Sequence, residues 1–125
     1  MDDFQTFKQL LTVVQRKCNY DDNNTWFEGP QTYLDAVKNE IDEVSEELSK
    51  SRHCYIEDEL GDVLWGFLNT VAALEKTHDV NLDSVISRAF NKYNQRISAI
   101  ENNEPWDEVK KSQKRALEEE YKKEK

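Results

Sequence analysis

The sequence predicts an all-α protein because of its composition and the spacing of its apolar residues. It contains three Gly and two Pro among 125 residues, so few positions would break a helix. Apolar residues recur every three or four positions along most of the chain, which is the period of one helix face. One domain over residues 1–125 is the most economical organisation for this length.

This spacing predicts four helices and a terminal segment. The helices are expected over residues 3–17, 30–49, 55–76 and 82–102. The loop "NYDDNNTWFEGP" separates the first two, and Pro30 suits the first position of the second helix. Residues 107–125 have a helix-forming composition but few apolar residues, which predicts a terminal helix or a partly flexible tail. The expected fold is therefore a four-helix-bundle-like domain with an additional C-terminal helix or tail.

The second and third helices each carry an apolar seam. The seam of the second helix consists of Leu34, Val37, Ile41, Val44 and Leu48. The seam of the third helix consists of Ile56, Leu60, Val63, Phe67 and Leu74. Further apolar residues beside this second seam widen it, so the third helix is expected to be the most buried.

Composition also limits the classes of function. The formal net charge of −9 argues against a nucleic-acid surface, because phosphate contacts need a basic face. No apolar stretch has the length of a membrane span, and the N-terminus lacks the pattern of a signal peptide. Cys18 and Cys54 form no C-x-x-C motif, so a reducing, cytoplasmic location is expected.

Four acidic residues occupy matching positions beside the two seams. Glu40 and Glu43 lie three residues apart, and each directly precedes a seam residue. Glu59 and Asp62 repeat this relation in the third helix, and Glu47 is a further candidate one turn on. If the two seams pack together, the four carboxylates gather on one flank of the contact.

Such a cluster is expected to bind a cation. Mutual repulsion raises the pKa values of gathered carboxylates unless a cation neutralises them. Oxygen ligands without nearby Cys or paired His suit Mg²⁺, with Mn²⁺ as a substitute, better than Zn²⁺. The ordinary alternative is that these acids are solvent-exposed charge, as on most acidic helices.

The fourth helix carries the opposite charge. Lys92 and Arg96 lie four residues apart on the flank of its apolar face, and such a pair complements a polyphosphate. Asn69 lies seven residues after Asp62, on the same helix face, where it could contact a base or sugar. Each of these residues also fits an ordinary surface position.

These motifs resemble the signature of the MazG-like nucleoside triphosphate pyrophosphohydrolases. The E-x-x-E and E-x-x-D motifs of that family are matched by "EIDE" at Glu40–Glu43 and "ELGD" at Glu59–Asp62. Further matches are Lys92 with Arg96, Trp106 with Lys110, Asn69 after the second motif, and the order of Cys18, Trp26 and Gln31 before the first. Asn39 departs from the family, which often has a second glutamate at this position.

The resemblance implies an all-α enzyme that hydrolyses nucleoside or deoxynucleoside triphosphates to monophosphate and pyrophosphate with Mg²⁺, as nucleotide-pool housekeeping. It implies that the catalytic and metal-binding residues are Glu40, Glu43, Glu59 and Asp62. It implies substrate contacts from Lys92, Arg96, Asn69, Trp106, Lys110, Trp26 and Gln31. It also implies a homodimer or a dimer of dimers, which the wide apolar faces of the helices predict independently.

Two alternatives stay open. A base-selective dUTP or dCTP pyrophosphatase, or a phosphoribosyl-ATP pyrophosphohydrolase, would use the same acids on a different substrate. A non-enzymatic helical interaction module would use the acids only for solubility and the seams to bind a partner helix.

Overall fold

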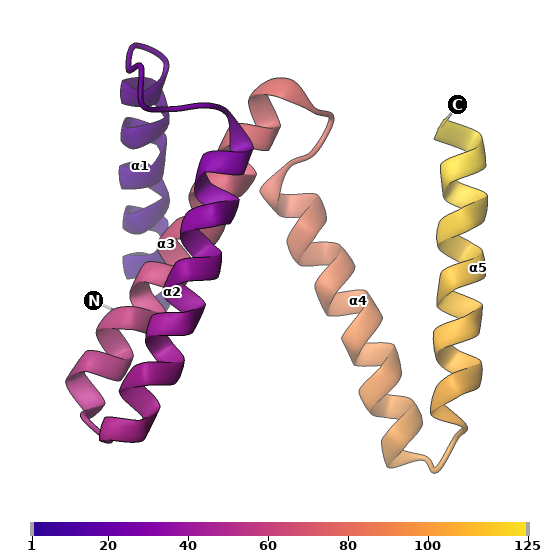
Figure 1. Cartoon of the computed structure of the whole chain (residues 1–125). Coiled ribbons are helices and arrows are strands. Elements are labelled where there is room, and N and C mark those ends of the chain that lie inside the picture. The colour runs from indigo at the N-terminus through magenta and orange to yellow at the C-terminus, as the bar shows by residue number, and fades with distance from the viewer. Residues whose placement is uncertain (1, 125) are drawn as a thin grey trace. The chain divides into compact units, whose positions relative to one another are not determined.

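The computed structural model describes residues 2–124, which form five α-helices and no strand (Figure 1). The helices are α1 (Asp3–Asp21), α2 (Pro30–Lys50), α3 (His53–Thr77), α4 (Leu82–Glu101) and α5 (Trp106–Glu124). The all-α prediction is confirmed for this part of the chain. The described chain divides into two compact units, one ending at Leu82 and the other beginning at Asp83. The single-domain organisation stays a prediction.

Helix α1 runs four residues beyond its predicted end. The Asp2 carboxylate caps the start of α1 by accepting a hydrogen bond from the backbone N–H of Gln5 at 2.8 Å. At its other end Asp21 is buried, where its carboxylate pairs with Lys17 and accepts a hydrogen bond from the Tyr33 hydroxyl. Because Tyr33 belongs to α2, the contact that holds the last turn of α1 in place is not visible in the local sequence.

Helices α2 and α3 form a hairpin joined by Ser51 and Arg52. Ser51 adopts a left-handed backbone conformation with φ 55°, and its N–H bonds to the Glu47 and Leu48 carbonyls. The Arg52 guanidinium donates to both oxygens of Glu47, at 3.1 and 2.6 Å. Glu47 therefore stabilises the turn between α2 and α3, and only 8% of its surface is exposed.

The two helices of the hairpin approach each other closely at Gly66. A Cβ atom at this position would lie 2.5 Å from Cγ2 of Val37, so only glycine allows α2 and α3 to approach this far. Gly66 lies two turns after Glu59, and Val37 lies one turn before Glu40. In an antiparallel helix pair, the residues that precede Gly66 on α3 lie opposite the residues that follow Val37 on α2. The close approach therefore brings the side of α3 that carries Glu59 toward the side of α2 that carries Glu40.

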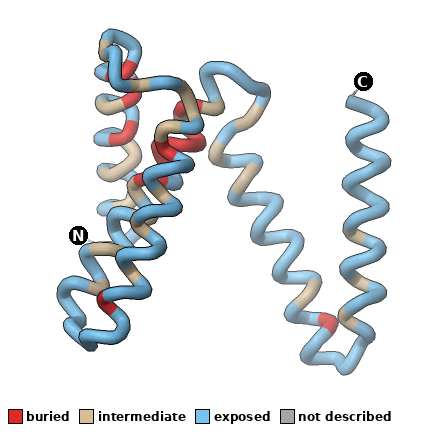
Figure 2. The backbone as a smooth tube through the Cα atoms, viewed as in Figure 1, coloured by how far each residue is buried: buried red, intermediate tan, exposed pale blue. Residues whose placement is uncertain are grey.

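The core of the first unit lies around the C-terminal half of α3 (Figure 2). This helix contributes Gly66, Leu68, Asn69, Thr70, Val71 and Ala73, more buried residues than any other described helix. Lys76 ties this end of α3 to α1 by donating to the Cys18 carbonyl and the Asp22 carboxylate. The prediction that the third helix is the most buried is confirmed for the described residues.

The predicted seams of α2 and α3 are both only partly buried. In α2 the prediction was wrong for Leu34, Ile41 and Leu48, which are 40%, 50% and 60% exposed. Leu60 is 51% exposed and Phe67 is 41% exposed, whereas Ile56 and Val63 are half-buried. The seam prediction was therefore wrong for Leu60 and Phe67, because the buried line of α3 runs through Gly66, Asn69 and Ala73 instead. The exposed apolar residues fit the predicted homo-oligomer, which stays a prediction that sedimentation mass would check.

The second unit consists of α4 and α5. Long polar side chains join the two helices, with the Arg88 guanidinium paired to the Glu120 carboxylate and the Arg96 guanidinium bonded to Gln113. Most of the large apolar residues of α4 are exposed, including Phe90 at 65%. Among the described helices, none combines the length and apolarity that a membrane span requires.

Gly66→Ala tests the close approach of α2 and α3. The added methyl group would meet Val37, so we expect a loss of about 1–3 kcal/mol from overpacking, partly offset by the helix preference of alanine of about 1 kcal/mol. Gly61→Ala is the matched control, because nothing lies within 4 Å of its Cβ position. Urea unfolding should show a small gain in stability for Gly61→Ala and a loss for Gly66→Ala.

Comparing Val37→Ala in two backgrounds tests whether Val37 is the residue that Gly66 contacts. Val37→Ala should cost less stability in the Gly66→Ala background than in the wild type, since it removes the clash. Equal effects of Val37→Ala in both backgrounds, or equal effects of the two alanine substitutions for glycine, would contradict the close contact.

Candidate metal and phosphate sites

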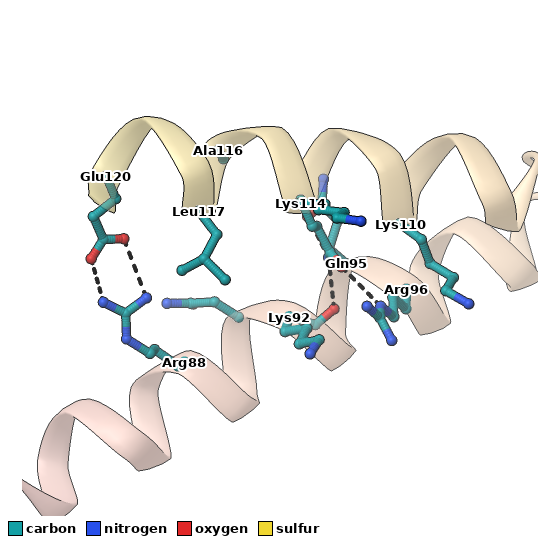
Figure 3. A pocket seen from close by; sticks show the side chains of 11 residues that line it. Arg88, Lys92, Gln95, Arg96, Lys110, Lys114, Ala116, Leu117 and Glu120 are labelled. Carbon is teal, nitrogen blue, oxygen red and sulfur yellow. Dashed lines mark hydrogen bonds and ion pairs between the residues drawn. The ribbon is translucent and has the colours of Figure 1, made fainter. Parts of the chain in front are cut away.

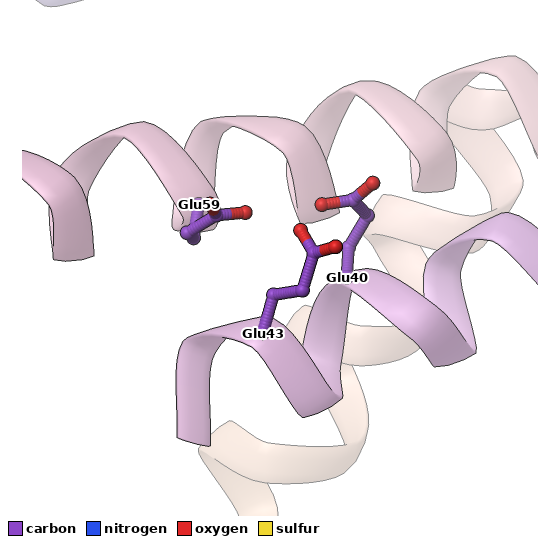
Figure 4. Close-up of side chains that lie close together, drawn as sticks. All are labelled: Glu40, Glu43 and Glu59. Carbon is purple, nitrogen blue, oxygen red and sulfur yellow. The ribbon is translucent and has the colours of Figure 1, made fainter. Parts of the chain in front are cut away.

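Three of the predicted acidic residues meet across the α2–α3 contact. Oxygens of Glu40 and Glu43 from α2 and of Glu59 from α3 all lie within 4.8 Å of one another. Figure 4 shows the Glu43 carboxylate between those of Glu40 and Glu59. We call these three residues, with the two described next, the acidic cluster.

The fourth predicted acid joins the cluster through Glu59. Oxygens of Asp58, Glu59 and Asp62 also lie within 4.8 Å of one another, so Glu59 belongs to both groups. Asp58 was not among the predicted ligands. Its spacing of four residues from Asp62, which puts both on one face of α3, was the signal that could have indicated it.

Two oxygens of the acidic cluster have no partner. Oε2 of Glu40 and Oε2 of Glu59 are buried atoms without a hydrogen bond in the described structure. None of the ion pairs among the described residues involves the five acids of the cluster. Buried carboxylate oxygens without a hydrogen-bond or ion-pair partner are stabilised by binding either a proton or a cation.

The raised pKa values of Glu59 and Glu40 reflect repulsion among the carboxylates of the acidic cluster. A hydrogen bond with Glu43, burial and the negative charge of Glu43 raise the pKa of Glu59 from 4.5 to about 7. The pKa of Glu40 is also raised, first by burial and then by Glu43 and Asp62. Glu47 behaves in the opposite way, because its hydrogen bond with Arg52 holds its pKa below the ordinary value. Glu47 is thus paired within the turn rather than a further ligand.

The donor set fits a hard divalent cation. Its members are carboxylate oxygens from two helices, without cysteine or histidine in either group. A cation at this position would satisfy the two orphaned oxygens and remove the repulsion that raises the pKa of Glu59. The residues that could hold it are Glu40, Glu43 and Glu59, with Asp58 and Asp62 beside them.

A second feature lies between α4 and α5 in the other unit. It is a groove of about 510 Å³ whose charged lining is mostly basic, and we call it the basic groove. Its cationic side chains are Arg88, Lys92, Arg96, Lys110 and Lys114. Figure 3 shows Arg88 facing Glu120 at one end, with Lys92, Arg96 and Lys110 farther along.

Four of the predicted substrate residues come together here. Lys92, Arg96 and Lys110 line the basic groove, and the Trp106 ring centroid lies 5.5 Å from the Arg96 guanidinium carbon. Lys92 and Lys110 have no ion pair among the described residues. The groove therefore offers uncompensated positive charge in a chain whose formal net charge is −9.

The other predicted substrate residues lie elsewhere in the first unit. Asn69 is 1% exposed and donates to the Trp65 carbonyl at 2.9 Å, so in this structure its role is packing. Trp26 packs edge-on against Tyr33, and the Gln31 amide donates to Asp35 at 2.8 Å. Glu40 lies ten residues beyond the start of α2, about 15 Å along its axis. Trp26 and Gln31 are thus not gathered with the acidic cluster.

Glu59→Gln tests the repulsion within the acidic cluster. The pKa of Glu59 is raised in the folded state, so ionising Glu59 destabilises the fold increasingly as pH rises from 4.5 through about 7. Glutamine has the same shape and no charge. In EDTA, the melting temperature of Glu59→Gln relative to wild type should therefore rise between pH 5 and pH 8.

Glu57→Gln provides the control, because Glu57 is an exposed acid of α3 outside the cluster. Its melting temperature relative to wild type should change little over the same pH range. A Glu59→Gln difference that stays flat or shrinks with rising pH would contradict the raised pKa.

Comparison with known proteins identifies the family. The sequence model of the MazG nucleotide pyrophosphohydrolase domain matches residues 28–100, more than half of the chain. The matched segment contains the whole acidic cluster and, of the cationic side chains of the basic groove, Arg88, Lys92 and Arg96. No curated protein sequence and no solved structure gives a significant match. The chain belongs to the MazG nucleotide pyrophosphohydrolase domain family.

Proposed function

We propose that this protein hydrolyses nucleoside or deoxynucleoside triphosphates to the monophosphate and pyrophosphate, with Mg²⁺ as cofactor and Mn²⁺ as a substitute. The observation that carries the proposal is the acidic cluster, in which two buried carboxylate oxygens lack any partner. Membership of a nucleotide pyrophosphohydrolase family supports the reaction class. Nucleotide-pool housekeeping in the cytoplasm is the role we propose for it.

The acidic cluster provides the metal ligands in this proposal. Glu40, Glu43, Glu59 and Asp62 are the proposed ligands and catalytic residues, with Asp58 as an additional candidate. When bound, Mg²⁺ supplies charge neutralisation at the phosphates and lowers the pKa of a water that attacks between the α and β positions. The rigid α2–α3 hairpin holds the carboxylates in place before the ion arrives, which limits the reorganisation that binding requires.

The basic groove provides the groups that bind phosphate. Lys92 and Lys110 act as point charges, and the Arg96 guanidinium can bind a phosphate through two N–H groups. As the pyrophosphate leaves, negative charge grows on its oxygens, and fixed cations stabilise that charge. Trp106 beside Arg96 is the aromatic residue that we propose lies near the nucleotide.

Product analysis tests the reaction. We expect monophosphate and pyrophosphate from a panel of ribo- and deoxyribonucleoside triphosphates with Mg²⁺. Glu43→Gln and Asp62→Asn should each reduce kcat by at least about 100-fold, because a metal site is worth several kcal/mol to the transition state. Chromatography of the nucleotides and a phosphate assay distinguish the products.

Asp42→Asn is the matched control, because Asp42 is an exposed acid of α2 next to Glu43 but outside the cluster. It should retain activity within a factor of about 3, as expected for an exposed side chain away from the site. Release of orthophosphate as the first product, or equal activity in Glu43→Gln and wild type, would rule out the proposed mechanism.

A further inference from the structure

Gln113 of α5 connects three groups of α4 through its amide. Its Oε1 accepts a hydrogen bond from Nε of Arg96 at 2.8 Å. Its Nε2 donates to the Lys92 carbonyl at 3.0 Å and to Oε1 of Gln95 at 2.8 Å. A half-buried side chain on one helix therefore bonds to three residues of the facing helix, Lys92, Gln95 and Arg96, which lie within about one turn.

The chemistry of these partners fixes the orientation of the amide. Nε of Arg96 can only donate, and a backbone carbonyl can only accept. The oxygen of Gln113 must therefore face Arg96, while its nitrogen faces Lys92. A glutamate could accept from Arg96 but could not donate to the carbonyl, and a methionine of similar shape could do neither.

These contacts determine what Arg96 can do. Its Nε is committed to Gln113, and its guanidinium lies 5.4 Å from the Tyr93 ring and 5.5 Å from the Trp106 ring. Its two Nη groups have no hydrogen-bond partner among the described residues. Arg96 lines the basic groove with Lys92 and Lys110, so these two groups are the ones left for a ligand there (Figure 3).

Arg88 in the same groove is held by a carboxylate instead of an amide. Both oxygens of the Glu120 carboxylate accept from its guanidinium, which fixes that side chain but also compensates its charge. A neutral amide fixes Arg96 without compensating its charge. Because an arginine side chain otherwise loses much rotamer freedom when it binds, a partner that orients it in advance increases affinity for an anion.

We propose that Gln113 is a positioning residue that holds Arg96 ready to bind the phosphate chain of the substrate. This inference rests on the proposed function, because it takes the ligand of the basic groove to be a polyphosphate. Gln113 lies outside the residues matched by the family model, which end at residue 100. Its position in the fold, and not a motif, assigns this role.

The test measures binding of inorganic tripolyphosphate to the full chain in EDTA by calorimetry. Gln113→Met should weaken binding about tenfold, as expected for a lost hydrogen bond to a charged group. Gln113→Glu should weaken it further, since it adds a negative charge beside Arg96. Ser112→Ala, an exposed neighbour outside the groove, should bind as wild type does. Circular dichroism should show the same helix content in all four proteins.

A double-mutant cycle separates positioning from a merely structural role. In the Arg96→Ala background, Gln113→Met should cause no further loss, because the guanidinium that it orients is gone. A full additional loss, or wild-type affinity of Gln113→Met, would overturn the inference, as would the absence of tripolyphosphate binding in the wild type. The assay involves neither metal nor turnover, so a failure of hydrolysis alone counts against the proposed function and leaves this result standing.

In a hydrolysis assay, Gln113→Met should lower kcat/KM about tenfold and raise KM, since Arg96 contacts the phosphate before the reaction as well as during it. A loss confined to kcat would contradict a role in holding the substrate. If Arg96→Ala itself leaves kcat/KM unchanged, the role of Arg96 in the proposed function fails, whatever the effect of Gln113→Met.

Discussion

The repulsion among carboxylates at the α2–α3 contact is the constraint on which the rest of the structure depends. Two helices cannot place Glu40, Glu43 and Glu59 together without a cost, and the raised pKa of Glu59 expresses that cost. The fold tolerates it because packing at Gly66 and Val37 holds the helices together nearby. Elsewhere the chain avoids such a cost by pairing its acids, as with Glu47 and Arg52 or Asp21 and Lys17. An unpaired cluster in a chain that pairs other partly buried acids indicates a ligand.

The two units treat charge in complementary ways. The first unit holds the acidic cluster, whose carboxylates form no ion pair with a basic side chain among the described residues. The second unit holds the basic groove, which is lined by five basic side chains and one acid, Glu120. In both units these charged groups come from two facing helices, which pack directly in the first unit and are joined by long polar side chains in the second. Side chains from the opposite helix then decide whether a charge is compensated. Glu120 compensates Arg88, whereas the amide of Gln113 orients Arg96 and leaves its charge available.

The acids of the site could be predicted from the sequence because helical spacing fixes which residues share a face. Glu40 and Glu43, and likewise Glu59 and Asp62, needed only the assumption that the two seams face each other. Features that depend on a partner distant in the sequence were not predictable in this way. Asp21 is buried against Tyr33 twelve positions later, and Gln113 bonds to Arg96 seventeen positions earlier. The exposure of Leu60 was missed for a similar reason, because apolar spacing does not show which of two adjacent stripes a neighbouring helix covers.

Proton release on metal binding tests the central claim most directly. The pKa of Glu59 is raised to about 7, so Glu59 is partly protonated near neutral pH, and a cation bound by the cluster must displace that proton. Calorimetric titration with Mg²⁺ or Mn²⁺ in two buffers of different ionisation enthalpy measures that proton. We expect proton release in the wild type, to which Glu40 with its raised pKa also contributes, and clearly less release in Glu59→Gln. Binding without proton release, or no binding to the wild type, would contradict the account of the acidic cluster as a metal site.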